Sequence, residues 1–130
     1  MFEAKVSEIY EFNGLSAVKF TTKFTKLTMV SLEIPRGISL ESAVKIGFKS
    51  SEVIIATQKL QNCSLSNEIP CVIQEAKFGE ILTSVKLKTS SDEIFESIIT
   101  TNSAKRLNLK SNLSVFAYIK ATSLFIDEIL

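Results

Sequence analysis

Two short segments of the chain carry side chains that could bind an anion. Lys49-Ser50-Ser51 and Lys120-Ala121-Thr122 each combine an ammonium group with a small residue and a hydroxyl. A tetrahedral dianion offers only hydrogen-bond acceptors, so its site needs converging N–H groups, hydroxyls and one or two cations. A small residue beside the lysine also lets the backbone approach the ligand. These segments therefore predict oxyanion sites made by hydrogen bonds, in which no side chain ligates a metal cation directly.

The two lysine segments occupy the same register of an internal repeat. Residues 44–55 align with residues 115–126 at a constant separation of 120 − 49 = 71, and apolar positions match apolar positions. Nearer the start of each repeat, Val18 matches Val85 at a separation of 85 − 18 = 67. The difference places an insertion at residues 100–106 of the second copy. The sequence thus predicts two modules of one kind, residues 1–62 and 66–130.

Short alternating segments separated by turn signals make up most of the chain. In residues 5–10 the pattern predicts a strand with Val6, Glu8 and Tyr10 on one face, and residues 84–89 alternate in the same way. One short helix is predicted, beginning at Thr101-Asn102-Ser103 and running to Leu107. Many short strands between regular turns indicate an all-β barrel or sandwich.

Composition excludes most enzyme chemistry. The 130 residues contain no histidine, which removes His-based triads, His-ligated zinc and His proton shuttles. Pairs of glutamates such as Glu93 and Glu96 lie on alternating strands, where they are far more often solvated than catalytic. We therefore expect no enzyme activity. Cys63 and Cys71 fit neither a redox pair nor a zinc knuckle, and we expect two buried thiols.

Two further groups of residues could contribute to an anion site. Thr100 and Ser103 stand at the predicted helix start, where unpaired N–H groups favour an anion, although ordinary helix capping is an equal alternative. Ser66 and Asn67 lie at the start of the second module, where a role in a turn is the slightly better interpretation.

The second module resembles a known family. The segments Asn67–Ile73, Phe78-Gly79, Val85–Leu87, Ile99–Ser103, Leu107–Leu109 and Val115–Ile126 follow the pattern of the Mop domain, the molybdenum-pterin-binding or molbindin family within the TOBE group. Residues 117–122 are its most specific part. The resemblance implies two tandem OB-like five-stranded β-barrels, with one short helix in the second. It also implies molybdate or tungstate as ligand, no organic cofactor, and a homo-oligomer, a trimer being favoured, with sites between modules.

The chain departs from the family pattern at several positions. Many Mop domains open with Ser-Ala-Arg-Asn, but here Ser66-Asn67 remains without an arginine beside it. Cys71 stands where the family usually has glycine. The first module begins so close to Met1 that it has no equivalent of Asn67. We therefore expect the Lys120 segment to belong to the more complete of two unequal sites.

Three interpretations of function remain open on the sequence. The first is an oxyanion carrier for intracellular storage, buffering or homeostasis, and the second is an anion-sensing module that regulates a transporter or transcription-factor partner. Nucleic-acid binding, the third, is disfavoured by the net charge of +1. No apolar run approaches the ~18 residues of a membrane span, and the N-terminus lacks the features of a signal peptide. We expect a cytoplasmic protein that interacts with no membrane.

Overall fold

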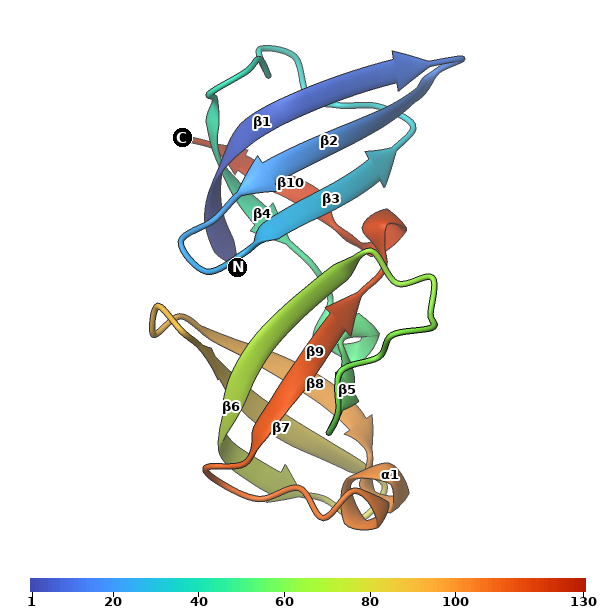
Figure 1. Cartoon of the computed structure of the whole chain (residues 1–130), viewed down its shortest axis with the longest axis vertical. Coiled ribbons are helices and arrows are strands. Elements are labelled where there is room, and N and C mark those ends of the chain that lie inside the picture. Colours follow the sequence, from blue (N-terminus) through green and yellow to red (C-terminus); the bar gives the residue numbers. More distant parts are fainter. The chain divides into compact units, whose positions relative to one another are not determined.

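The computed structural model describes all 130 residues, which divide into two compact units (Figure 1). Unit 1 comprises residues 1–48, 65–67 and 119–130, and unit 2 comprises residues 49–64 and 68–118. These units do not follow the sequence modules 1–62 and 66–130, because the last strand of each module pairs within the other unit. None of the chain's helices has the length and apolar character needed to cross a bilayer.

Unit 1 is a five-stranded antiparallel sheet. Its strand order is β10-β4-β1-β2-β3. The strands are β1 (Phe2–Phe12), β2 (Leu15–Thr21), β3 (Lys26–Ser31), β4 (Ala43–Gly47) and β10 (Phe125–Ile129). A short 3₁₀ helix, η2 (Ala121–Ser123), precedes β10 and packs beside β3. This contact brings the two edges of the sheet together, as in an OB-like barrel.

Unit 2 repeats the same plan. Its sheet has the order β5-β9-β6-β7-β8, with η1 (Ser50–Glu52) packed beside β8. The strands are β5 (Ile54–Ala56), β6 (Asn67–Phe78), β7 (Leu82–Thr89), β8 (Ile94–Thr100) and β9 (Ser114–Ile119). The one α-helix, α1 (Thr101–Arg106), follows β8 as the sequence predicts. Two five-stranded sheets and one short helix confirm the predicted all-β fold class.

Each sheet encloses its own apolar core. In unit 1 the largest fully buried side chains are those of Phe2, Val6, Val18, Phe20, Leu27, Met29, Ile46 and Ile119. In unit 2 they are those of Ile69, Ile73, Leu87 and Tyr118. All but one of these side chains are apolar, and the exception, Tyr118, has a hydroxyl that needs a partner inside the unit.

A β-bulge reverses the side-chain alternation in β1. The register with β2 shifts between Val6 and Glu8, so the inward position passes to Ile9, and Tyr10 is 65% exposed. The prediction that Val6, Glu8 and Tyr10 share one face was therefore wrong, because an inserted residue moves every later side chain to the opposite face. Strand β6 carries the same bulge between Ile73 and Glu75, which supports the duplication.

Candidate anion-binding site

The two lysine segments form the same local structure. Lys49 and Lys120 are the N-cap residues of η1 and η2, and both have extended backbone angles, φ −85° and ψ 136° for Lys49 and φ −64° and ψ 145° for Lys120. The turns close through Glu52 N, which donates to Lys49 O at 2.9 Å, and Ser123 N, which donates to Lys120 O at 3.0 Å. The sequence repeat is thus also a repeat of backbone conformation.

Each turn presents unused hydrogen-bond donors to its surroundings. The first N–H groups of a helical turn have no acceptor within that turn. Lys49 and Lys120 are exposed, and neither ammonium forms an ion pair or hydrogen bond with another group of the chain. Ser51 and Thr122 are exposed beside them. A cation, hydroxyls and backbone N–H groups therefore lie together in three residues, which is the donor set that an oxyanion requires.

The two turns differ in charge. η1 contains the carboxylate of Glu52, whereas η2 has no acidic residue and carries Ser123 at that position. A carboxylate within one turn of the donors repels a dianion, and the repulsion is partly screened by salt because Glu52 is exposed. The Lys120 turn is the more favourable of the two for an anion.

Strand β3 brings two of the sequence-predicted segments together in unit 1. The side chain of Asn67 is fully buried, and its Oδ1 accepts from Thr28 N at 2.7 Å while its Nδ2 donates to Thr28 O at 2.9 Å. This amide therefore anchors residues 65–67 on β3 within unit 1, and the exposed Ser66 precedes Asn67. Because η2 also packs beside β3, Asn67 and the Lys120 turn both contact this strand.

Thr100 and Ser103 act as a helix cap. Thr100 Oγ1 accepts from Ser103 N at 3.2 Å and donates to Ser103 Oγ at 2.9 Å, and Arg106 Nη2 donates to Ser103 Oγ at 3.3 Å. Both residues belong to unit 2, whereas the Lys120 turn belongs to unit 1. The sequence left capping and anion binding open for these two residues, and the contacts described here are typical of capping.

Sequence reasoning missed a polar network next to these segments. Tyr118 Oη donates to Glu68 Oε2 at 2.8 Å and accepts from Leu60 N at 2.8 Å, and Lys59 Nζ lies 3.2 Å from Glu68 Oε1. Tyr118 stands two residues before Lys120, and Glu68 directly follows Asn67. The network therefore fixes the ends of β9 and β6 from which both candidate segments continue.

The network also shifts two pKa values. The hydrogen bond from Tyr118 holds the pKa of Glu68 below its usual value, and Lys59 acts in the same direction. Burial raises the pKa of Tyr118 above its usual value, and the neighbouring Glu68 carboxylate adds to this effect. Glu68 is therefore ionised and Tyr118 neutral across the ordinary pH range, which keeps the hydrogen bond between them charge-assisted.

Comparison with known proteins agrees with the repeat and the fold. Residues 64–126 match the family model of the TOBE domain. Residues 64–126 are thus similar to a TOBE domain. That match spans the second sequence module, including Lys120-Ala121-Thr122, and it confirms the resemblance drawn from the residues of that module. No curated protein sequence matches the chain.

A solved structure shows that the likeness in fold extends beyond the matched TOBE domain. It is a crystal structure, with molybdate bound, of the cytoplasmic molybdate-binding protein ModG. The two chains are 22% identical, the superposition covers 99% of this chain and 94% of that one, and the TM-score is 0.92. This chain therefore has the fold of ModG over essentially its whole length.

Proposed function

We propose that this protein binds molybdate or tungstate as an intact oxyanion and stores or buffers it in the cytoplasm. The observation that carries the proposal is the Lys120 turn, which presents a free ammonium, the Thr122 hydroxyl and unused N–H groups without a carboxylate. The likeness to a molybdate-binding protein with its ligand bound supports the same ligand class. Both ligands are dianions that such donors can hold through hydrogen bonds alone.

The proposed sites are unequal. The stronger one consists of Lys120, Ala121 and Thr122, together with Ser66, which directly precedes the residue that is hydrogen-bonded to β3. The weaker one consists of Lys49, Ser50 and Ser51, because Glu52 adds a negative charge to that turn. Asn67 anchors the segment beside Ser66 on β3, and Thr100 and Ser103 cap α1.

We further propose that the protein is a homo-oligomer, as the family resemblance implies. The donors of both turns are exposed, and an anion held only at an exposed turn would compete with water on most of its surface. A second chain would cover the ligand and supply further donors. The two equivalent hairpins, β1–β2 and β6–β7, also expose large apolar side chains that an assembly could bury. These are Tyr10, Phe12 and Leu15 in the first, and Phe78, Ile81 and Leu82 in the second.

Calorimetric titration with molybdate, tungstate, sulfate and phosphate tests this function. We expect molybdate and tungstate to bind with micromolar or better affinity, and to raise the melting temperature because only the folded protein forms the site. Lys110→Ala serves as a control, since Lys110 is an exposed lysine outside both turns. Failure of all four anions to bind at that affinity would contradict the proposal.

A further inference from the structure

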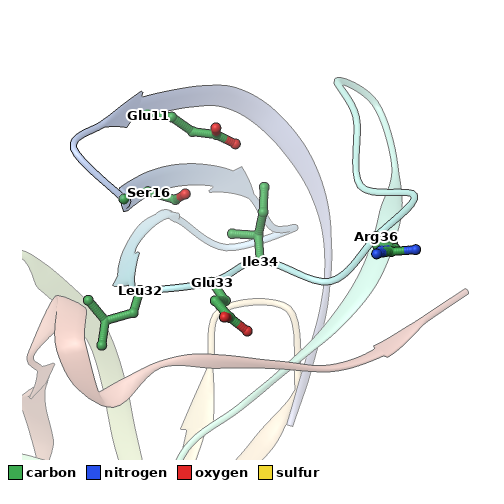
Figure 2. Close-up of a pocket in the computed structure, with 7 residues that line it drawn as sticks. Glu11, Ser16, Leu32, Glu33, Ile34 and Arg36 are labelled. Carbon is green, nitrogen blue, oxygen red and sulfur yellow. The ribbon is translucent and has the colours of Figure 1, made fainter.

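Unit 1 has an open hollow at the end of its sheet where the β1–β2 hairpin meets the segment after β3. Its volume is about 440 Å³, and Figure 2 shows the side chains around it. It is lined by Glu11, Gly14, Ser16, Leu32, Glu33, Ile34 and Arg36. None of the candidate anion-binding residues is among them, so the hollow needs an explanation of its own.

The equivalent place in unit 2 is occupied by α1. Strand register makes Ser16 the counterpart of Thr83, because Ser16 pairs with Glu11 in β1–β2 and Thr83 pairs with Phe78 in β6–β7. In unit 2 the Oγ1 atoms of Thr83 and Thr101 are hydrogen-bonded at 2.9 Å. Thr83 therefore receives the first residue of the helix.

Two further contacts seat the same helix residue. Thr101 N donates to Ile81 O at 2.8 Å, and Thr101 Oγ1 donates to Gly79 O at 2.8 Å. Ala104, three residues later, is completely buried. The seat in unit 2 thus recognises a hydroxyl residue at the start of a helix followed by a small residue one turn on.

Unit 1 has the equivalent of the surface on which α1 packs in unit 2, but it has no helix there. Ser16 is only 5% exposed, yet its hydroxyl has no hydrogen-bond partner in the chain, and Figure 2 shows it among the side chains that line the hollow. Gly14, at the register position of Ile81, also lines the hollow. Solvent reaches the Ser16 hydroxyl from the hollow, so this hydroxyl is available to hydrogen-bond a polar group that enters there.

The chain's own segment after β3 cannot supply that group. By register with Thr83 and Ile99, Leu32 and Glu33 take the positions that Thr100 and Thr101 have in unit 2. Leucine cannot cap a helix, and Pro35 disfavours the helical conformation for the residue before it. Residues 32–42 therefore contain no helix, and the seat stays open.

The charges around the hollow favour the positive end of a helix. Glu11, Glu33 and Arg36 line it, which gives a net formal charge of −1 − 1 + 1 = −1, and none of the three forms an ion pair within the chain. Carboxylates stabilise a helix N-terminus, where the partial positive charge of the unpaired N–H groups lies. α1 itself has no acidic residue in its first turn, so the positive end of a helix of this kind would be attracted by the net negative charge of the hollow.

We propose that this hollow binds the first turn of a helix from a partner protein. The helix would begin with Ser or Thr and carry a small residue three positions later, as α1 does with Thr101 and Ala104. The α1 of a second copy is not available for this role, because both residues are already buried against its own unit 2. Such docking would let a partner respond to this protein, as the sensing interpretation requires.

NMR titration of the full-length, isotope-labelled protein with a helix-stabilised peptide tests the proposal. The peptide has the chain's own residues 99–110, which contain the helix that fits the equivalent seat. We expect chemical-shift changes confined to the residues that line the hollow. Ser16→Val should weaken binding about five- to tenfold by removing the hydroxyl, and Glu11→Gln with Glu33→Gln should weaken it further at low salt. Ser114→Ala, an exposed serine elsewhere, should have no effect.

Two results would overturn this proposal. One is the absence of shifts at millimolar peptide, and the other is equal binding to the parent and to Ser16→Val. Changes in the same residues with protein concentration alone would indicate self-association instead, and would also overturn it. A graft that replaces residues 32–42 by residues 100–113 provides an independent measurement. The graft should raise the melting temperature and abolish peptide binding. A lowered melting temperature would contradict the claim that the hollow can accept a helix. None of these outcomes depends on anion binding.

Discussion

The ring of Phe125 lies directly on Gly47. The two residues face each other in the β10–β4 pair, and a Cβ atom added to Gly47 would come within 2.5 Å of Phe125 Cε2. The equivalent pair in unit 2 joins Ile54 of β5 to Tyr118 of β9. In the exchanged arrangement the aromatic Phe125 faces glycine and the aromatic Tyr118 faces an aliphatic residue. Unexchanged strands would instead place Phe125 beside Tyr118 and Ile54 beside Gly47.

Filling the space at Gly47 should loosen β10. We expect Gly47→Ala to lower the free energy of unfolding by about 1 kcal/mol, the lower end for overpacking, because Phe125 is 43% exposed and its ring can move toward solvent. Urea unfolding measures the effect. In a Phe125→Ala background the same change should be neutral or slightly stabilising, since alanine also restricts the unfolded chain. An equal loss in both backgrounds would show that the ring is not the cause.

Removing the carboxylate from η1 should strengthen the weaker anion site. Glu52→Gln takes away the one acidic group of that turn, so we expect molybdate affinity at the Lys49 site to rise about two- to fivefold at low salt, with the gain shrinking as salt increases. Calorimetry at two salt concentrations measures it. Glu80→Gln changes an equally exposed glutamate outside both turns and should leave affinity unchanged. A gain of the same size in Glu80→Gln would point to net charge alone.

Tyr118→Phe should destabilise the protein in a pH-dependent way. The variant loses the hydroxyl that bonds Glu68 and Leu60 N, at a cost of about 1–3 kcal/mol for disrupting a charge-assisted pair. The folded-state pKa of Glu68 lies below its usual value of 4.5, so this stabilisation is present above that pH and is lost as pH falls through the folded pKa.

At high pH the contribution of the network to stability changes in the opposite direction. Tyr118 has a raised folded-state pKa, so its contribution is complete below the usual value of 10.0 and is lost as pH rises through the folded pKa. The stability difference between parent and variant should therefore be greatest in the neutral range. Urea unfolding from pH 3 to pH 11 measures it, with Tyr10→Phe at an exposed tyrosine as control. A difference that is constant across this range would contradict the role of the network.

The two cysteines should differ sharply in reactivity. Cys63 is exposed, so the expectation of two buried thiols was wrong for this residue, whereas Cys71 is buried. Burial raises the pKa of Cys71 to about 12, which leaves almost no thiolate at neutral pH. A thiol reagent should titrate one group in the native protein and two in denaturant. In Cys63→Ser, rapid reaction of the native protein would contradict this assignment.

The sequence predicted the repeat and the local form of the site because both depend on short segments. Lys49 and Lys120, which are 71 residues apart, were predicted to occupy equivalent positions of a repeat, and each of them caps a turn of the same backbone conformation. The strand exchange could not be predicted in this way, because β5 and β10 carry similar apolar patterns and either could pair with β4 or β9. The close approach of Phe125 to Gly47 can be recognised only once these two residues are known to face each other.

The role of individual polar residues was equally hard to predict. Asn67 is typical of a turn by residue type, but it is a buried anchor on Thr28, a residue 39 positions earlier in the chain. The Tyr118–Glu68 hydrogen bond spans 50 positions, and no local pattern marks such a pair. The sequence could predict the role of a polar residue only where its partner lies within a few positions, as with Thr100 and Ser103.

The central claim is that an oxyanion is held at the Lys120 turn. Anomalous diffraction from crystals grown with tungstate tests it most directly, because tungsten reveals its own position. We predict a tungsten peak with its oxygens within hydrogen-bond distance of Lys120 and Thr122, and loss of that peak in Lys120→Ala crystals grown in the same way. Tungsten found only at places remote from this turn, or an unchanged peak in Lys120→Ala, would contradict the account.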